Sequence, residues 1–167
     1  IDKVIQQLNN TQIVVNGGLF VIRIDKNNSR FDTRVVLTKA KDNKEIGYFE
    51  IDTEFSIVDG GYKGGYIKIT DKEYEQKGFA KLILRKLAEI FPADQELVTE
   101  VAHEESLDGF KKDKAVSEIY IVKLFKRAGW ELTAYGYYDG NGEYHTGNFG
   151  EIMNADEIKG ESGTVIV

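Results

Sequence analysis

The sequence predicts an α/β (α+β) domain with a mixed, mainly antiparallel central sheet flanked by helices. Short apolar runs typical of strands fill the first half of the chain, two amphipathic helix patterns follow, and a strand–turn–strand pattern lies near the end. The 167 residues suit one domain with a sizeable core. We therefore expect a single domain over residues 1–167, with its core from about residue 12 to 153.

Strand signals dominate the first half of the chain. Runs of β-branched and aromatic residues alternate with polar or glycine-containing turns. The expected elements are a short helix at 2–9, a strand or bent strand pair at 12–24, a turn at 26–29, and strands at 33–40, 45–55 and 66–70. The strands at 33–40 and 45–55 should form a hairpin, and the glycine-rich stretch from Gly60 to Gly65 should form a loop.

Helix signals follow in the second half. The apolar residues from Phe79 to Ile90 fall on one helical face, directly after Gly78, and Pro92 marks the end of this helix. A second helix is expected over 115–128, with Gly129 as its C-terminal cap. The remaining expected elements are a strand at 96–102, a polar loop at 103–114 and a closing hairpin made of 130–138 and 144–153. The pattern of residues 154–167 favours no particular element.

Composition excludes several classes of function. The chain has no cysteine, which excludes disulfides, thiolate metal sites and a cysteine nucleophile, and its two histidines are too few for a histidine zinc site. The net charge of −6 argues against a general nucleic-acid binder. No apolar run approaches the length of a membrane span. Because the sequence begins with Ile rather than Met, we expect it to be a piece of a longer chain.

Gly78 stands at the first turn of the clearest predicted helix. Glycine costs a helix interior up to about 1 kcal/mol relative to alanine. A helix N-terminus offers N–H groups without partners and a positive dipole end. Gly78 and the small Ala80 therefore indicate either the approach of an anion to the backbone or a tight strand-to-helix turn without a ligand. Lys77 and Lys81 are read either as phosphate contacts or as solvated lysines of a first turn.

Two short motifs, in this order, resemble the GNAT superfamily of N-acyltransferases. The window Glu75-Gln76-Lys77-Gly78-Phe79-Ala80 is similar to the acyl-CoA loop of that family, which runs Arg/Gln-x-x-Gly-x-Gly/Ala after a strand. The run from Leu124 to Trp130 is similar to the family's Leu-Tyr-x-Lys-x-Gly-Phe at the end of a later helix. The resemblance in order of elements covers roughly residues 35–153, and the two motifs together are more specific than either alone.

The resemblance implies an N-acyltransferase that uses acetyl-CoA and an amine acceptor, which is either a protein or a small molecule. The pantetheine arm would lie where the strand at 67–70 splays from the strand at 96–102, and a backbone N–H near Ile69 would polarise the thioester carbonyl. The expected residues that bind acetyl-CoA are Ile69, Thr70, Gln76, Lys77, Gly78, Phe79, Ala80 and Lys81. The expected setting is cytoplasmic, with no membrane or nucleic-acid partner and with a homodimer as one option.

Three departures from the family pattern leave a second function open. Glu75 stands where the family usually has Arg or Gln, and Phe125 stands where many members have the tyrosine that protonates the leaving thiolate. The segment before residue 35 is too short for the two helices that members commonly carry between their first two strands. The alternative hypothesis is a catalytically inactive GNAT-fold module that binds or interacts.

Three residues are candidates for proton transfer. His103 follows the strand at 96–102 directly, where a base could deprotonate an ammonium acceptor, although an exposed loop histidine is the slightly favoured interpretation. Glu50 could be a general base on an acidic strand face, although the wet face of a strand is the more ordinary interpretation. Tyr120 could replace the missing acid, although a tyrosine on a helix face usually belongs to a core.

Overall fold

The computed structural model describes residues 1–26, 30–57, 60–101, 120–131, 134–138, 144–148 and 163–166. The chain divides into two compact units, Ile1–Gln95 and Glu96–Val167, and each is described on its own. The expectation of one domain over the whole chain stays a prediction. Nowhere in the described ranges does a helix have both the length and the apolar character that a membrane crossing needs.

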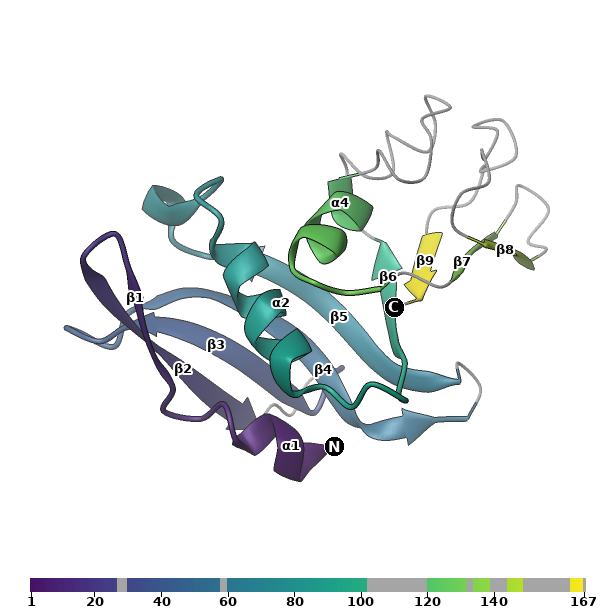
Figure 1. The fold of residues 1–167 in the computed structure, drawn as a ribbon, viewed down its shortest axis with the longest axis horizontal. Coiled ribbons are helices and arrows are strands. Elements are labelled where there is room, and N and C mark those ends of the chain that lie inside the picture. The colour runs from purple at the N-terminus through teal and green to yellow at the C-terminus, as the bar shows by residue number, and fades with distance from the viewer. Residues whose placement is uncertain are drawn as a thin grey trace. The chain divides into compact units, whose positions relative to one another are not determined.

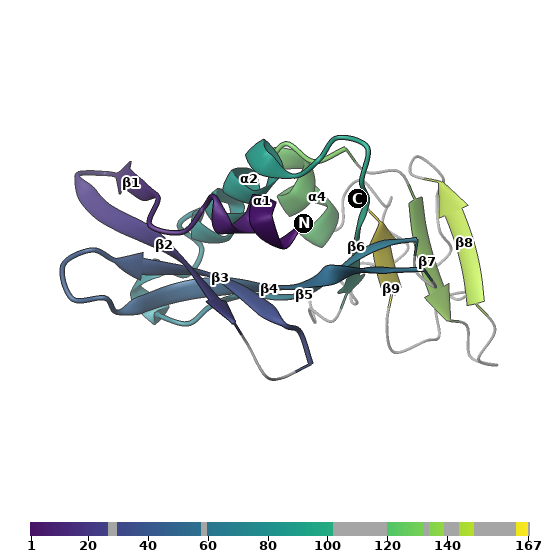
Figure 2. The same ribbon diagram turned by 90° about the horizontal axis from the view of Figure 1, so that it is seen from below.

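The first unit is built on an antiparallel sheet whose strands follow one another in chain order, β1-β2-β3-β4-β5 (Figure 1). Its helices α1 and α2 lie on the same side of this sheet (Figure 2). The elements are α1 (Asp2–Gln6), β1 (Gln12–Val15), β2 (Gly18–Lys26), β3 (Thr33–Lys39), β4 (Glu45–Ser56), β5 (Gly61–Ile69), the 3-10 turn η1 (Lys72–Tyr74) and α2 (Phe79–Ile90). The predicted short helix, the hairpin of β3 and β4, and the helix after Gly78 are thus confirmed.

The predicted strand or bent strand pair at 12–24 is a β-hairpin. Asn16 and Gly17 both have left-handed backbones, with φ values of 49° and 79°. This is the conformation that a two-residue hairpin turn requires, and Asn-Gly is the sequence that adopts it most readily. The turn therefore closes β1 onto β2 from a purely local signal.

The core of the first unit lies between α2 and the sheet. The helix buries Phe79, Ile83, Leu84 and Leu87, and it contacts β3, β4 and β5. On β4, Phe49 is almost fully buried, with 1% of its surface exposed. Burial of a side chain of this size contributes about 1.5–3 kcal/mol, so the apolar face of α2 holds the helix, and the loop that begins it, at a set place on the sheet.

The prediction of a loop from Gly60 to Gly65 is wrong for most of that stretch. Strand β5 begins at Gly61 and pairs with β4 as far as Ile69, with two interruptions of the register, because β4 offers an unpaired edge that outweighs the weak strand preference of glycine. The register shifts where Phe49 pairs with Ile67 and Ile51 pairs with Gly64, which is a β-bulge on β5. A Cβ on Gly65 would lie 2.4 Å from the Phe31 ring, so this strand needs glycine there.

The second unit combines a helix with antiparallel strands. Its elements are β6 (Leu97–Val101), α4 (Tyr120–Arg127), β7 (Ala134–Tyr138), β8 (Tyr144–Asn148) and β9 (Gly163–Ile166). Within the described residues the strands lie in the order β6-β9-β7-β8. The strand at 96–102 and the closing hairpin are confirmed, whereas β9 was not anticipated. The predicted loop 103–114, the helical residues 115–119, the turn residues 27–29 and the turn of the last hairpin lie outside the described residues.

Helix α4 ends in a Schellman motif. Gly129 has φ of 95°, its N–H donates to the carbonyl of Lys126 at 3.0 Å, and the N–H of Trp130 donates to the carbonyl of Phe125 at 3.1 Å. The rings of Phe125 and Trp130 meet edge to face with centroids 6.0 Å apart. This pairing of hydrogen bonds and an apolar contact is the usual C-terminal cap, which confirms the predicted role of Gly129.

Candidate functional site

The segment between β5 and α2 carries the residues that the sequence singled out. It passes through η1 (Lys72–Tyr74) and reaches Gly78, which is the N-cap of α2, with φ of 84° and ψ of 9°. A Cβ on Gly78 would find no atom within 4 Å. The left-handed backbone therefore favours glycine, and the space beside it is open to a ligand rather than filled by the protein itself.

The N-terminus of α2 has the features of an anion site. Its first hydrogen bond runs from the N–H of Leu82 to the carbonyl of Gly78 at 3.1 Å, so the N–H groups before Leu82 are left to other partners. Gly78 provides no side-chain cap, and the first turn contains no acidic residue. Lys81 lies in that turn instead, where a cation opposes the helix dipole unless an anion is present.

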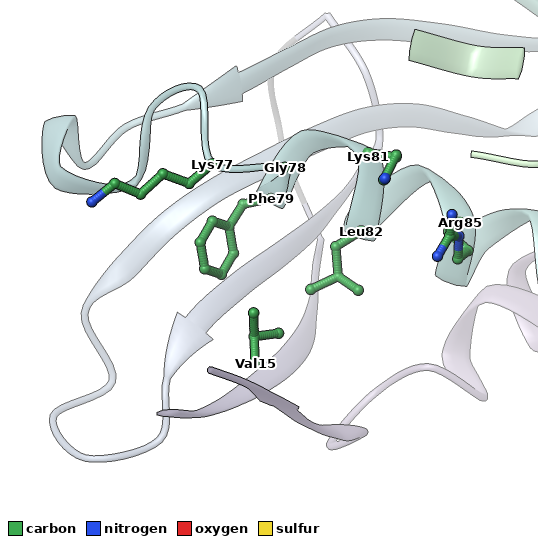
Figure 3. Close-up of a pocket in the computed structure, with 7 residues that line it drawn as sticks. All are labelled: Val15, Lys77, Gly78, Phe79, Lys81, Leu82 and Arg85. Carbon is green, nitrogen blue, oxygen red and sulfur yellow. The ribbon is translucent and has the colours of Figure 1, made fainter. Parts of the chain in front are cut away.

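A small open pocket of about 90 Å³ adjoins this helix start. Figure 3 shows Val15 facing Phe79 and Leu82 across the pocket, while Lys77 extends away along the loop. The lining residues are Val15, Lys77, Gly78, Phe79, Lys81, Leu82 and Arg85. Four of the predicted binding residues are thus brought together beside a partly apolar floor.

Sequence reasoning missed three of the lining residues. Arg85 follows Lys81 by one helical turn, so a search for basic residues at i, i+4 and i+8 from Lys77 would have found it. Leu82 was placed on the apolar face of the helix; in the structure it is half-buried and faces the pocket. Val15 comes from β1, and no sequence signal places that strand beside α2.

The residues predicted to contact acetyl-CoA differ in burial and in the hydrogen bonds that they already make. Phe79 lines the pocket but is buried and packs on Phe20, with ring centroids 5.1 Å apart. Gln76 is exposed and has a left-handed backbone, with φ of 58°. The N–H of Thr70 already donates to the carbonyl of Ile46 at 2.8 Å, at the end of β5 just beyond Ile69.

Glu50 is buried and paired, which corrects the interpretation of its position as the wet face of a strand. It is 6% exposed, and its Oε1 accepts hydrogen bonds from Nη2 and Nε of Arg34 at 2.9 and 3.2 Å. The guanidinium of Arg34 also lies 4.2 Å from the ring centroid of Tyr48. The hydrogen bond to Glu50 raises the pKa of Arg34, so this side chain stays a cation where β3 pairs with β4.

Of the two remaining candidates for proton transfer, the structure describes one. His103 lies outside the described residues. Tyr120 is the first described residue of α4 and is 41% exposed, so it is not a core residue as the ordinary interpretation held. Phe125 is buried with 1% of its surface exposed, packed on Trp130. In the part of the chain that the structure describes, no group of three His, Cys, Asp or Glu side chains could hold a metal ion.

Comparisons with known proteins give matches among solved structures alone. No family model matches the chain, and no curated protein matches it. Mutant forms of the spermidine/spermine N-acetyltransferase SpeG from Vibrio cholerae are 19% identical, with 84% of this chain and 68% of that chain covered and a TM-score of 0.45. An aminoglycoside 6′-N-acetyltransferase complexed with coenzyme A is 10% identical, with 80% and 70% covered and a TM-score of 0.40.

A protein of unknown function from Aquifex aeolicus is 8% identical, with 98% of this chain and 76% of that chain covered and a TM-score of 0.52. This likeness extends over nearly the whole chain and shows a similar fold. N-acetyltransferases are thus among the matching structures. At these identities the likeness concerns the fold alone, and it confirms the predicted α/β class without carrying over a reaction or a substrate.

Proposed function

We propose that this protein is an N-acyltransferase that moves an acyl group, in the first place acetyl, from acyl-CoA to an amine. The observation that carries the proposal is the uncapped N-terminus of α2 behind the left-handed Gly78, with Lys77 and Lys81 beside it and open space in front. The acyl-CoA motif of the sequence coincides with this helix start.

The physical basis is charge complementarity. The pyrophosphate of coenzyme A is an anion, and successive N–H groups at a helix N-terminus together with the helix dipole favour such a group. The chain as a whole carries a net charge of −6, yet the pocket lining includes Lys77, Lys81 and Arg85 and no acidic residue. An anion at this point would remove the conflict between Lys81 and the dipole.

The proposed reaction is direct transfer. The lone pair of a neutral amine attacks the thioester carbonyl carbon, the C–N bond forms, and the negative charge on the carbonyl oxygen is stabilised by a backbone N–H near Ile69. Collapse breaks the C–S bond, releases the thiolate of CoA and leaves the amide after loss of one proton from nitrogen. In this proposal His103 takes the proton, directly or through water, and Tyr120 protonates the thiolate. Glu50, which the sequence offered as a base, is engaged by Arg34 instead.

A non-catalytic module is the second candidate. It is favoured by Phe125, whose buried ring offers no proton, and by Glu75, whose carboxylate precedes the phosphate loop. Both candidates share the fold and can share the binding of CoA. They differ in whether bound acetyl-CoA is consumed when an amine is supplied.

The first experiment is calorimetric titration of the protein with acetyl-CoA and with CoA. We expect a dissociation constant on the order of 10 µM, within the range of about 1 µM to 1 mM that Michaelis constants of enzyme substrates commonly span. Gly78→Asn keeps the left-handed backbone and adds no charge, whereas Gly78→Asp adds a carboxylate in front of the pyrophosphate. We expect the Asp variant to bind CoA about tenfold more weakly than the Asn variant, because its carboxylate repels the pyrophosphate.

Gly60→Asp is the matched control. Gly60 also has a positive φ of 74° and open space around its Cβ, but it lies in the turn before β5. It should leave CoA binding unchanged. No binding to the wild-type protein at millimolar ligand, or equal binding by both Gly78 variants, would remove the basis of the proposal.

A second assay separates the enzyme from the module. Release of the CoA thiol is followed with acetyl-CoA and a panel of amines, namely a polyamine, an aminoglycoside and a lysine-containing peptide. Thiol release above the rate without amine supports the transferase. Tight binding of CoA with no release for any amine supports the module.

A further inference from the structure

Asp71 is a buried carboxylate that the proposed reaction does not use. It is 8% exposed and stands directly after β5, where its N–H and that of Thr70 both donate to the carbonyl of Ile46, at 3.2 and 2.8 Å. Its Oδ1 accepts a hydrogen bond from the N–H of Glu73 at 3.1 Å and so caps η1. Its Oδ2 is buried without a hydrogen bond, yet it lies 3.2 Å from Nζ of Lys44.

The cationic partners of Asp71 lie next to the turn of the β3–β4 hairpin. Lys44 precedes β4, and Lys39, whose Nζ lies 3.7 Å from Oδ2, ends β3. The same Nζ of Lys39 stands 4.9 Å from the ring centroid of Tyr74, which ends η1. The hairpin and the segment after β5 are thus tied at two points by two lysines. We call Lys39, Lys44, Asp71 and Tyr74 the loop anchor.

We infer that Asp71 is a positioning residue that, through the loop anchor, sets the conformation of residues 72–78 and thereby the anion site at the start of α2. This inference rests on the proposed function in one respect, since it takes that helix start as the binding site for the phosphates of CoA. Asp71 itself is not among the residues that line the pocket.

The backbone of the loop is strained and needs such a restraint. Gln76 has φ of 58°, a left-handed conformation that costs a non-glycine residue about 1–2 kcal/mol. Such conformations persist where the surroundings over-determine them. Downstream of Gln76, Phe79 packs edge to face on Phe20 and on Tyr74, each at 5.1 Å between centroids. Asp71 supplies the corresponding restraint upstream.

A cap alone does not account for aspartate at this position. Serine or asparagine would accept the hydrogen bond from Glu73 equally well without bringing a charge into the interior. Burial alone would raise the pKa of Asp71, but the N–H of Glu73 and the cations of Lys44 and Lys39 outweigh it and hold the pKa below its ordinary value. The charge is therefore retained, and it is the charge that attracts the two lysines.

The test uses Asp71→Asn, which keeps the cap and removes the charge. Amide hydrogen exchange of the ligand-free protein is measured by mass spectrometry on peptides that cover residues 72–81. We expect exchange in this segment to accelerate about tenfold while β2 and β3 are unchanged, and the dissociation constant of CoA to rise about tenfold. Glu89→Gln, which neutralises an exposed partner of Lys86 on α2, is the matched control and should change neither quantity.

Variants of Lys44 keep the test decisive if Asp71→Asn fails to fold. Lys44 is largely exposed, with 60% of its side chain accessible, so Lys44→Gln leaves the carboxylate paired with Lys39. It should change amide exchange and CoA affinity in the same direction as Asp71→Asn does. Lys44→Arg, which keeps the positive charge, should retain wild-type exchange and affinity. Unchanged exchange in residues 72–81 of both neutral variants would overturn the inference. Faster exchange in a protein whose wild type binds no CoA would support the loop anchor and overturn the proposed function.

Discussion

Gly78→Ala tests why a glycine opens α2. The left-handed backbone at Gly78 costs alanine about 1–2 kcal/mol relative to glycine. No atom lies within 4 Å of the new Cβ, so no collision adds to this cost. Alanine also restricts the unfolded chain, which returns about 0.4–1 kcal/mol. The net loss in the free energy of unfolding is therefore about 1 kcal/mol, equivalent to a drop in Tm of about 2–4 °C at this chain length.

The assay is urea unfolding followed by circular dichroism, with Gly60→Ala as the control. Gly60 has φ of 74° and equally open surroundings, so the same backbone cost should appear there. Gly78→Asn should cost less than Gly78→Ala, because asparagine tolerates the left-handed region. A neutral Gly78→Ala would refute the conformational explanation. A loss above about 3 kcal/mol would show that the side chain meets protein atoms, against the geometry described above.

Three further predictions concern the surroundings of the site. Gly65→Ala places a Cβ 2.4 Å from the Phe31 ring and should cost about 1–3 kcal/mol in urea unfolding, with part regained in the double variant that adds Phe31→Leu; a neutral single variant would contradict the packing of the bulge. Glu50→Gln leaves Arg34, whose side chain is 34% exposed, without its counter-charge and should lower the free energy of unfolding by about 1–2 kcal/mol. The same change should cost less in a protein that already carries Arg34→Met, and an equal loss in both backgrounds would mean that the ion pair contributes nothing. The pKa of Asp71 is lower in the folded protein than its ordinary value of 3.8, so its contribution to stability is fully present above that pH and is lost as the pH falls below it through the folded pKa. Unfolding measured from pH 2 to 7 should therefore show a smaller acid-induced loss of stability in Asp71→Asn than in the wild type. An identical pH profile of the two proteins would exclude a charged anchor.

Local signals account for the parts of the fold that were predicted correctly. The helix after Gly78, the cap at Gly129 and the turn at Asn16-Gly17 each depend on residues within a few positions of one another. Apolar spacing and the tolerance of glycine for positive φ are properties that a short window contains. The loop predicted from Gly60 to Gly65 was wrong because the preference of glycine for turns is a local signal. The unpaired edge of β4, which draws these residues into a strand, is not visible in a short window.

The candidate site divides in the same way. Lys77, Gly78 and Lys81 were found because they are contiguous with a motif and a helix start. The partners of Asp71 could not be found, because Lys39 and Lys44 reach it only after β3, β4 and β5 have paired. Glu50 was judged from strand alternation to face water, but its pairing with Arg34 across the β3–β4 register buries it.

The sequence by itself determined the α/β class, the helix that opens at Gly78 and the basic character of that opening. The tertiary structure decided that Val15 of β1 lies against the helix start, that Asp71 is held by two lysines of another hairpin, and that β9 lies between β6 and β7. The physical reason is the range of the forces involved. Backbone conformation and helix periodicity act within one or two turns of chain, whereas strand pairing, burial and ion pairs join residues whose separation in the sequence carries no information about their distance in space.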